Sequence, residues 1–305
     1  MKITIAGGTG FLGKEIAQYF VNQGDEIIIF TRGKSRVEGK LKYVKWDAKT
    51  LGDWTSELED TDVLINLTGK SVDCKYTEQN KMEILSSRVD ASRVLGIALQ
   101  EIKNPPQLWL NASTATIYKH SLKQPMDEYN GEIGNDFSMS VAQDWEKAFY
   151  ESNTPKTRKI ALRISLVLGR NGGVFPVMKK LVKFGLGGRQ GSGKQKFAWI
   201  HIHDLLRIID FSISNDELSG PINCASPDDI SNADFMKALQ VGMKVPFGLP
   251  SPKFMLKIGA FFLRTEPELV LKSRFVMPKK LMDNGFVFNY EEVGDAMMQL
   301  LSNQK

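Results

Sequence analysis

A glycine-rich segment near the N-terminus has the residue types and spacing of a phosphate-binding loop. Residues 6–13 read Ala-Gly-Gly-Thr-Gly-Phe-Leu-Gly, after an apolar run at residues 3–6 and at the start of a helical pattern. Glycine lets the backbone turn tightly and approach a pyrophosphate, and the N-terminus of the following helix offers free N–H groups. The segment predicts a dinucleotide site, with a structural turn as the alternative; its expected residues are Gly7, Thr9, Gly10, Phe11, Leu12 and Gly13.

The end of the second apolar run indicates which dinucleotide is bound. NAD-binding proteins usually carry Asp or Glu there, because its carboxylate accepts hydrogen bonds from the ribose hydroxyls. Residues 30–36 read Phe-Thr-Arg-Gly-Lys-Ser-Arg instead, with three cations and no acid. We expect Thr31, Arg32 and Arg36 to surround a 2′-phosphate, with Arg32 stacked on adenine and forked to that phosphate. This pattern favours NADP(H) over NAD(H), and a solvent-exposed charged loop is the alternative.

Two motifs in the C-terminal half resemble other kinds of site but lack essential parts. Residues 188–195 nearly match the loop of ATP-hydrolysing proteins, but Gln195 stands where Ser or Thr would hold magnesium. His201 and His203 form a His-x-His pair without a second group of metal ligands. We expect no ATP hydrolysis and no metal, and we favour a strand-to-helix turn with Asp204 near the helix start. A histidine pair facing a pocket stays open, since alternate residues of a strand share a face.

The elements that position these motifs alternate between strand and helix. Strand-length apolar runs occur at 3–6, 26–30, 42–44, 62–66, 108–110 and 159–162, and helical patterns at 13–21, 78–102 and 141–150. The strand runs are apolar throughout, which is typical of a parallel sheet covered on both faces. The sequence therefore predicts an α/β fold, a Rossmann-type doubly wound parallel sheet with a smaller, mostly helical C-terminal lobe.

The composition and the secondary-structure pattern of the chain change after about residue 168, and this change predicts two domains. Glycines crowd into residues 169–193, and the C-terminal third has mostly helical patterns interrupted by prolines. We expect an NAD(P)-binding domain over residues 1–165. Residues 166–305 then form a substrate lobe and C-terminal extension, although a stretch around 197–224 is a candidate to return to the sheet.

Composition excludes several classes of protein. The 305 residues are 42% hydrophobic and 25% charged, the balance of an ordinary globular chain. The net charge of +5 is spread along the sequence, so we expect no nucleic-acid partner. No apolar run is long enough for a bilayer, and the N-terminus does not resemble a signal peptide. Only two cysteines occur, so we expect a reducing cytoplasm. The sequence leaves a homodimer open.

Several motifs together resemble one known family. They are the glycine loop at 7–13, Ile-Asn-Leu-Thr-Gly at 65–69, Ser-Arg-Val at 87–89, Asn-Ala-Ser-Thr-Ala-Thr-Ile-Tyr at 111–118, Asp-Trp-Glu at 144–146, the glycines of 187–193, Trp-Ile-His-Ile-His-Asp at 199–204, Met-Pro-Lys-Lys-Leu at 277–281 and Gly-Phe-Val-Phe at 285–288. The chain resembles the extended short-chain dehydrogenase/reductase superfamily. The resemblance is closer to its atypical "epimerase family protein" branch, which has bacterial and human members.

This resemblance implies further cofactor contacts. Leu67, Thr68 and Gly69 would line the cofactor's ribose through their backbone, and Asp47 would lie near adenine. Arg88 stands on the long helix where the superfamily commonly has Asn, so it would face the cofactor. The alternatives are a strand-end turn, a surface acid and a solvated helix arginine.

The catalytic pattern of the superfamily is incomplete in this chain. Its Tyr-x-x-x-Lys pair, in which the lysine lowers the tyrosine pKa, falls on Ser138 and Ala142. The hydroxyl helper is present as Ser113 or Thr114, just before Tyr118. The sequence therefore makes Ser113, Thr114 and Tyr118 the catalytic candidates.

Three explanations of the missing pair stay open. Tyr118, His201 or Asp204 could provide acid–base catalysis from another wall of the site. The protein could instead bind NADP(H) as a sensor or regulator without turnover. Alternatively, the alignment is shifted and a tyrosine such as Tyr129 enters the site.

Cationic residues on the C-terminal side suggest an anionic or polyhydroxylated substrate. Arg163, Lys194 and His201 are the substrate candidates, with Arg189 nearby in the glycine-rich stretch 185–193. That stretch is equally readable as a loop that closes over the site or as a surface connection. The resulting hypothesis is an NADP(H)-binding, epimerase/dehydratase-like oxidoreductase with a small carbonyl or sugar-nucleotide-like substrate.

Overall fold

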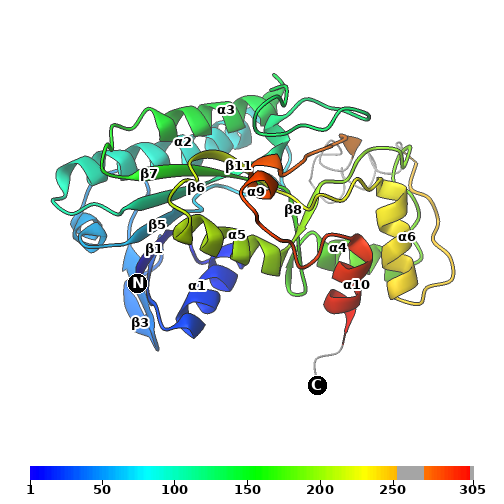
Figure 1. Ribbon diagram of the computed structural model, residues 1–305, viewed down its shortest axis with the longest axis horizontal. Coiled ribbons are helices and arrows are strands. Elements are labelled where there is room, and N and C mark those ends of the chain that lie inside the picture. Colours follow the sequence, from blue (N-terminus) through cyan, green and yellow to red (C-terminus); the bar gives the residue numbers. More distant parts are fainter. Residues whose placement is uncertain (253–270, 303–305) are drawn as a thin grey trace.

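The computed structural model describes residues 1–252 and 271–302. Its main element is an eight-stranded sheet with helices on both faces (Figure 1). In spatial order, the strands of this sheet are β11 (Gly220–Cys224), β7 (Arg158–Ile164), β6 (Leu108–Thr114), β5 (Val63–Asn66), β1 (Lys2–Ala6), β2 (Glu26–Thr31), β4 (Leu41–Lys45) and β3 (Arg36–Glu38).

The strand order reverses at the centre of the sheet. β1 lies between β2 and β5, and every neighbouring pair is parallel except β3 with β4. In sheets of this kind, ligands bind outside the carboxyl ends of the strands at the point of reversal. The predicted Rossmann-type sheet is confirmed. Its topology indicates a ligand site at the carboxyl ends of β1 and β5.

Alternate residues of the strands pack against two helical layers. Ile3 and Ile27 contact the layer of α1 (Phe11–Gln23) and α5 (Ile202–Ser214). Ile28 and Leu64 pack on the opposite side, toward α2 (Glu78–Glu101) and α3 (Phe137–Tyr150) (Figure 1). The apolar strand runs are therefore explained by burial of both faces.

Local signals explain most helix boundaries. Helix α1 ends at Gly24, whose left-handed φ of 96° lets its N–H reach the carbonyls of the last turn. Thr77 caps α2 by accepting a hydrogen bond from the Asn80 N–H. Asp136 caps α3 in the same way, so this helix begins four residues before the predicted position 141.

The remaining elements form a smaller lobe. A three-stranded sheet contains β10 (Trp199–His201), β8 (Leu166–Gly169) and β9 (Gly172–Gly173). Its helices are α4 (Phe175–Lys183), α6 (Asn232–Gly242) and α10 (Val293–Leu301). The helix α9 (Lys279–Asp283) packs on β11 of the larger sheet, and the short 3₁₀ turns η1 (Asp53–Leu58) and η2 (Ala115–Ile117) also belong to the larger unit. The helical C-terminal lobe is confirmed, although residues 253–270 of the predicted helical third lie outside the described residues. The boundary at residue 165 stays a prediction.

An aromatic ring joins the glycine loop to this lobe. Side chains added at Gly169 or Gly172 would overlap the ring of Phe11, which fills the space beside the β8–β9 hairpin. Phe11 is also the first residue of α1. Among the described helices, none has the length and apolar character needed to cross a bilayer.

Candidate functional site

Three of the four glycines in the N-terminal loop, Gly7, Gly10 and Gly13, have different roles in the structure. Gly7 has a φ of 73°, and its N–H donates to the Phe30 carbonyl at 3.0 Å. A Cβ at Gly13 would overlap the backbone of Gly8, so this position holds the helix against the loop. A Cβ at Gly10 would meet nothing within 4 Å, and no side chain caps α1 there. Gly10 therefore leaves open space in front of an uncapped helix N-terminus.

The end of β5 forms the neighbouring wall. The N–H of Leu67 donates to the Ala6 carbonyl at 2.9 Å, which holds this strand end beside the end of β1. A Cβ at Gly7 would lie 2.9 Å from Thr68 Oγ1, and this buried hydroxyl has no hydrogen-bond partner among the described residues. A buried polar atom without a partner is costly unless a ligand or water supplies one. The predicted residues Leu67 and Thr68 thus come together with the glycine loop.

Arg88 approaches the same strand end from α2. A Cβ at Gly69 would lie 3.0 Å from the Cζ of Arg88, and the guanidinium lies 5.0 Å from the centre of the Trp145 ring. Its Nη1 donates to the Ile84 carbonyl at 2.8 Å. Burial lowers the pKa of Arg88 to about 10. We refer to Gly7, Gly10, Thr68, Gly69 and Arg88 as the β1–β5 cluster.

The two arginines after β2 differ in whether their side chains already have partners within the protein. The Arg36 side chain donates to Glu38 at 2.6 Å and lies over the Tyr43 ring at 3.7 Å. Arg32 is exposed and makes neither a hydrogen bond nor an ion pair within the described chain. The Thr31 hydroxyl accepts a hydrogen bond from the Gly33 N–H at 3.1 Å. Arg32 is therefore the more available of the two arginines.

Asp47 stabilises a turn after β4. Its carboxylate accepts hydrogen bonds from the N–H groups of Lys49 and Thr50, and from the Thr50 hydroxyl at 2.6 Å. These hydrogen bonds, led by that of the hydroxyl, lower the pKa of Asp47 to about 2. The intervening Ala48 adopts a φ of 63°. The predicted contact between Asp47 and adenine stays a prediction beside this turn role.

A buried polar network lies at the ends of β6 and β7. The Ser113 hydroxyl donates to the Glu146 carboxylate at 2.6 Å, and Arg163 forks to the same carboxylate at 2.9 and 2.8 Å. A further N–H of Arg163 donates to the Tyr118 hydroxyl at 2.7 Å, which in turn donates to Asn223 at 2.9 Å. We refer to these five residues as the Glu146 network.

The electrostatics of this network follow from burial and pairing. Burial raises the pKa of Tyr118 even though Arg163 works in the opposite direction. Burial opposes the charge of Arg163, but the hydrogen bonds and charge of Glu146 outweigh this effect and raise its pKa. The exposed fractions are 1% for Tyr118 and 7% for Arg163. A guanidinium that is already paired with a carboxylate is poorly available to a substrate anion. A buried phenol with a raised pKa stays protonated at neutral pH, so it is not ready to accept a proton.

Sequence reasoning missed two members of this network. Glu146 belongs to the Asp-Trp-Glu motif, which signalled the family but not a role, and Asn223 lies in the apolar strand β11 without any local signal. Thr114 lies outside the network. Its half-buried hydroxyl accepts a hydrogen bond from the Thr116 N–H at 3.1 Å.

The other substrate candidates lie in the smaller lobe and at its junction with α5. His201 is fully buried; one ring nitrogen accepts from the His203 N–H at 3.1 Å and the other contacts Gln299 at 3.1 Å. Burial lowers the pKa of His201 to about 4. The buried Asp204 carboxylate pairs with Arg207 and accepts hydrogen bonds from two backbone N–H groups. These contacts give His201 and Asp204 structural tasks at the start of α5, whereas Lys194 is exposed.

The other residues considered in connection with the missing tyrosine–lysine pair do not come together in one site. Ala142 is fully buried in α3, Ser138 lies in the first turn of that helix, and Tyr129 is largely exposed. Among the described residues, no group of three His, Cys, Asp or Glu side chains could hold a metal ion.

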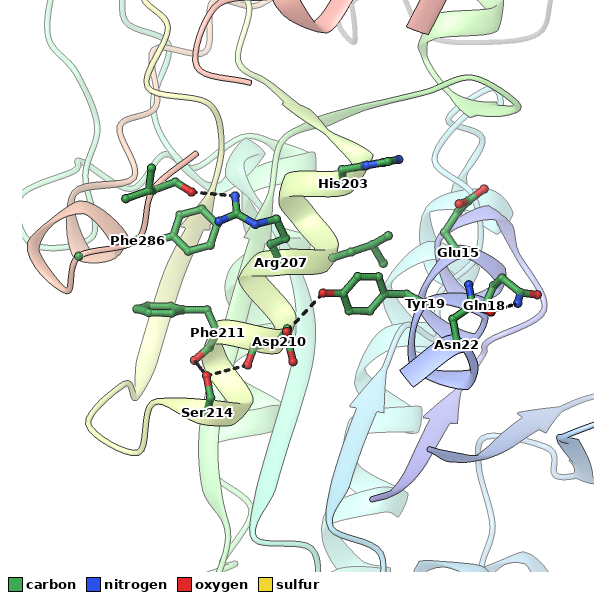
Figure 2. A pocket seen from close by; sticks show the side chains of 13 residues that line it. Glu15, Gln18, Tyr19, Asn22, His203, Arg207, Asp210, Phe211, Ser214 and Phe286 are labelled. Carbon is green, nitrogen blue, oxygen red and sulfur yellow. Dashed lines mark hydrogen bonds between the residues drawn. The ribbon is translucent and has the colours of Figure 1, made fainter. Parts of the chain in front are cut away.

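A separate groove of about 700 Å³ lies between α1 and α5 (Figure 2). Glu15 and Tyr19 line it from α1, and Arg207 and Asp210 from α5; the Tyr19 hydroxyl points toward Asp210 and donates to it at 3.3 Å. Of the two histidines considered as a pocket-facing pair, His203 lines this groove and the buried His201 does not; no other cofactor, catalytic or substrate residue predicted above lines it. The groove is therefore distinct from the β1–β5 cluster.

Comparison with known proteins now identifies the family. The model of the NAD dependent epimerase/dehydratase family matches residues 3–225, more than half of the chain. The chain belongs to this family. A second model, a domain of unknown function (DUF1731), matches residues 251–300, part of which lies outside the described residues.

Relatives of the family extend over the whole chain. Epimerase family protein YfhF of Bacillus subtilis is 33% identical over 308 residues, covering 100% of this chain and 99% of that protein. The crystal structure of human epimerase family protein SDR39U1 (isoform2) with NADPH matches with a TM-score of 0.88 and 27% identity, covering 99% of each chain. The nucleoside-diphosphate sugar epimerase from Corynebacterium glutamicum matches with a TM-score of 0.79 and 27% identity, covering 99% of this chain and 58% of that one. The predicted membership in the "epimerase family protein" branch is confirmed.

Proposed function

We propose that this protein binds NADP(H) at the carboxyl ends of β1 and β5. The observation that carries the proposal is the uncapped N-terminus of α1, which faces open space at Gly10 beside the unpartnered hydroxyl of Thr68. These features fit a pyrophosphate and ribose, because the helix N-terminus attracts phosphate and the hydroxyl can bond to the sugar. The human relative that was crystallised with NADPH supports this assignment.

Arg32 is the residue proposed to select the 2′-phosphate. It is exposed, follows β2 directly, and has no partner within the described chain, whereas Arg36 is paired with Glu38. A guanidinium forms charge-assisted, forked hydrogen bonds with a phosphate. Selectivity for NADP(H) over NAD(H) therefore rests mainly on Arg32.

We further propose an epimerase/dehydratase-like oxidoreductase acting on a small carbonyl or sugar-nucleotide-like substrate. A bound nicotinamide would supply or accept the hydride. Thr114 ends β6 with a half-buried hydroxyl that can donate to a substrate oxygen. Ser113 already donates to Glu146, so it can only accept from a ligand. Thr114 is therefore the stronger hydroxyl candidate.

A binding protein without turnover is the second candidate function. The buried position of Tyr118 with its raised pKa favours it, because positions 138 and 142 hold Ser and Ala where the tyrosine and lysine of the pair would stand. In either case a cytoplasmic location, a homodimer and an absence of nucleic-acid partners stay predictions.

Calorimetric titration with NADPH and NADH tests the cofactor assignment. Arg32→Ala is expected to weaken NADPH binding by about 1.5–3 kcal/mol, the value of a charge-assisted hydrogen bond, and to leave NADH binding nearly unchanged. Arg36→Ala removes the same charge from the same loop and serves as the matched control, with a smaller effect. Equal losses for both cofactors in Arg32→Ala would remove Arg32 from this role.

Turnover separates the two candidate functions. The wild-type protein is incubated with NADPH or NADP⁺ and a set of carbonyl compounds and sugar nucleotides, and the nicotinamide absorbance is followed. A substrate-dependent change supports the oxidoreductase. Tight cofactor binding with no change across the whole set supports the binding protein.

A further inference from the structure

Arg88 differs from Arg158, Arg163 and Arg207, which also lie at least partly inside the protein. Arg163 pairs with Glu146, Arg207 with Asp204, and Arg158 with Asp216 and several carbonyls. Arg88 pairs with no carboxylate of the described chain and makes one hydrogen bond, to the Ile84 carbonyl. A charge that is withdrawn from water is costly unless an opposite charge compensates it. Arg88 therefore has the position of a cation whose counter-ion is not part of the described chain.

The surroundings of Arg88 form one continuous set of contacts with the glycine loop. Gly69 packs against its guanidinium, and the preceding Thr68 presents its unpartnered hydroxyl to Gly7. On the other side the guanidinium lies over the Trp145 ring, whose buried Nε1 also lacks a partner among the described residues. Two buried donor groups without a partner among the described residues thus lie near the half-buried guanidinium of Arg88. A guanidinium has five N–H donors, so most of those of Arg88 remain for a ligand.

We propose that Arg88, with Trp145 and the end of β5, is an anion-binding subsite that receives a phosphate or carboxylate group of the bound ligand. The inference rests on the proposed function for its location and extends it by naming the chemistry that the site recognises. The anionic group belongs either to the pyrophosphate of the cofactor or to an acidic substrate. A side chain at position 69 would press against the guanidinium, so glycine there lets the chain after β5 lie close to Arg88.

The ionisation of Arg88 is consistent with this role. Burial lowers its pKa to about 10, so the side chain stays charged at neutral pH. An anion beside it would reverse this shift, because opposite charges stabilise each other most where water is excluded.

The experiment compares Arg88→Gln, Arg88→Lys and Arg93→Gln in the full-length protein. Arg93 is an exposed arginine on the same helix and serves as the matched control. Binding of NADPH is measured by calorimetry. Binding of inorganic pyrophosphate and of malonate is measured by tryptophan fluorescence, with and without saturating NADPH. Trp145→Phe identifies the part of the signal that comes from this site.

Loss of the guanidinium is expected to weaken binding of the matching anion by at least about 10-fold, as for a charge-assisted hydrogen bond. A loss of NADPH and pyrophosphate binding assigns the subsite to the cofactor. Unchanged NADPH binding, with malonate binding to the NADPH-loaded protein lost in Arg88→Gln and its signal lost in Trp145→Phe, assigns it to an acidic substrate. Arg88→Lys keeps the charge without the fork and is expected to lose less.

Two results would contradict the subsite and the proposed function separately. If Arg88→Gln and Arg88→Lys bind all three probes as the wild type and Arg93→Gln do, the anion subsite is wrong although NADPH binding stands. If the wild type does not bind NADPH at all, the proposed function is wrong; the pyrophosphate and malonate titrations still decide the subsite. Should Arg88→Gln fail to fold, Arg88→Lys and the wild-type fluorescence against Trp145→Phe still give the answer.

Discussion

The Glu146 network and the β1–β5 cluster both contain polar side chains close to the carboxyl ends of the central strands, yet they differ in how many of their polar atoms have hydrogen-bond partners. In the network, the carboxylate of Glu146, the fork of Arg163 and the phenol of Tyr118 bond to one another. In the cluster, the Thr68 hydroxyl lacks a partner and the Arg88 charge lacks a counter-ion within the described chain.

Whether a polar side chain already has partners within the protein distinguishes structural residues from ligand-binding residues better than residue type does. Buried polar groups in native proteins nearly always have partners, so those without one point to a missing ligand or water. Tyr118 was a catalytic candidate and Arg163 a substrate-binding candidate because of their type and position, but each is already bonded within the protein. Arg88 and Thr68 are the residues whose surroundings are incomplete.

The largest expected effect comes from breaking the network. Glu146→Ala leaves Arg163 buried without its carboxylate, and should lower the free energy of unfolding by about 3–5 kcal/mol. Replacing both charges, in Glu146→Leu with Arg163→Met, should recover most of this loss. Urea unfolding of the three proteins measures it. A loss below about 1 kcal/mol in Glu146→Ala would contradict a structural role for the network.

The pH dependence of the free energy of unfolding tests whether the buried His201 ring has a structural role like that of the Glu146 network. Its native pKa is lowered to about 4 from an ordinary value of 6.5. Between these pH values the unfolded chain binds a proton that the native protein excludes, so the free energy of unfolding should fall as the pH falls from about 6.5 to 4. The total is on the order of 3 kcal/mol.

His201→Asn provides the control for this pH dependence, since asparagine can still cap α5 but does not titrate. Urea unfolding at a series of pH values should show a shallower acid slope for this variant. The same slope in both proteins would mean that other groups cause the acid loss.

The smallest expected effects on stability come from alanine substitutions at two glycines of the N-terminal loop. Gly13→Ala places a methyl group into the backbone of Gly8 and should destabilise the fold by about 1–3 kcal/mol. Gly10→Ala meets no protein atom, so its stability should stay within about 1 kcal/mol of the wild type. Its methyl group would lie where a phosphate approaches, so NADPH affinity should fall at least about 10-fold. Thermal unfolding and calorimetry together distinguish the variants; normal NADPH binding by Gly10→Ala would place the dinucleotide elsewhere.

The sequence was sufficient to predict the sheet and the glycine loop because both depend on local patterns. Apolar runs of strand length alternate with helical periodicity, and Gly7, Gly10 and Gly13 lie where β1 turns into α1. The roles expected of Tyr118 and Arg163 were harder to predict, because they depend on partners that are distant in the sequence. Tyr118 donates a hydrogen bond to Asn223, which is 105 residues away in the sequence. No local sequence pattern around either residue predicts this contact.

The start of α3 shows the same limit at short range. The apolar periodicity begins near Val141, but the cap is the polar Asp136, whose carboxylate accepts a hydrogen bond from the Met139 N–H. Periodicity locates the buried face of a helix and not its first residue. Likewise, Asp47 was expected near adenine from the resemblance, while the turn that it stabilises became visible only with its hydrogen bonds.

The ring of Phe11 has a consequence for how homologous sequences can diverge. It occupies the space that side chains at positions 169 and 172 would need, although these positions lie in the other lobe. A larger residue in the hairpin is therefore acceptable only together with a smaller one at position 11, which also begins the phosphate-facing helix. Positions 11, 169 and 172 should covary among members of the family, and the evolutionary rate of the hairpin should follow that of the cofactor loop rather than that of the lobe around it.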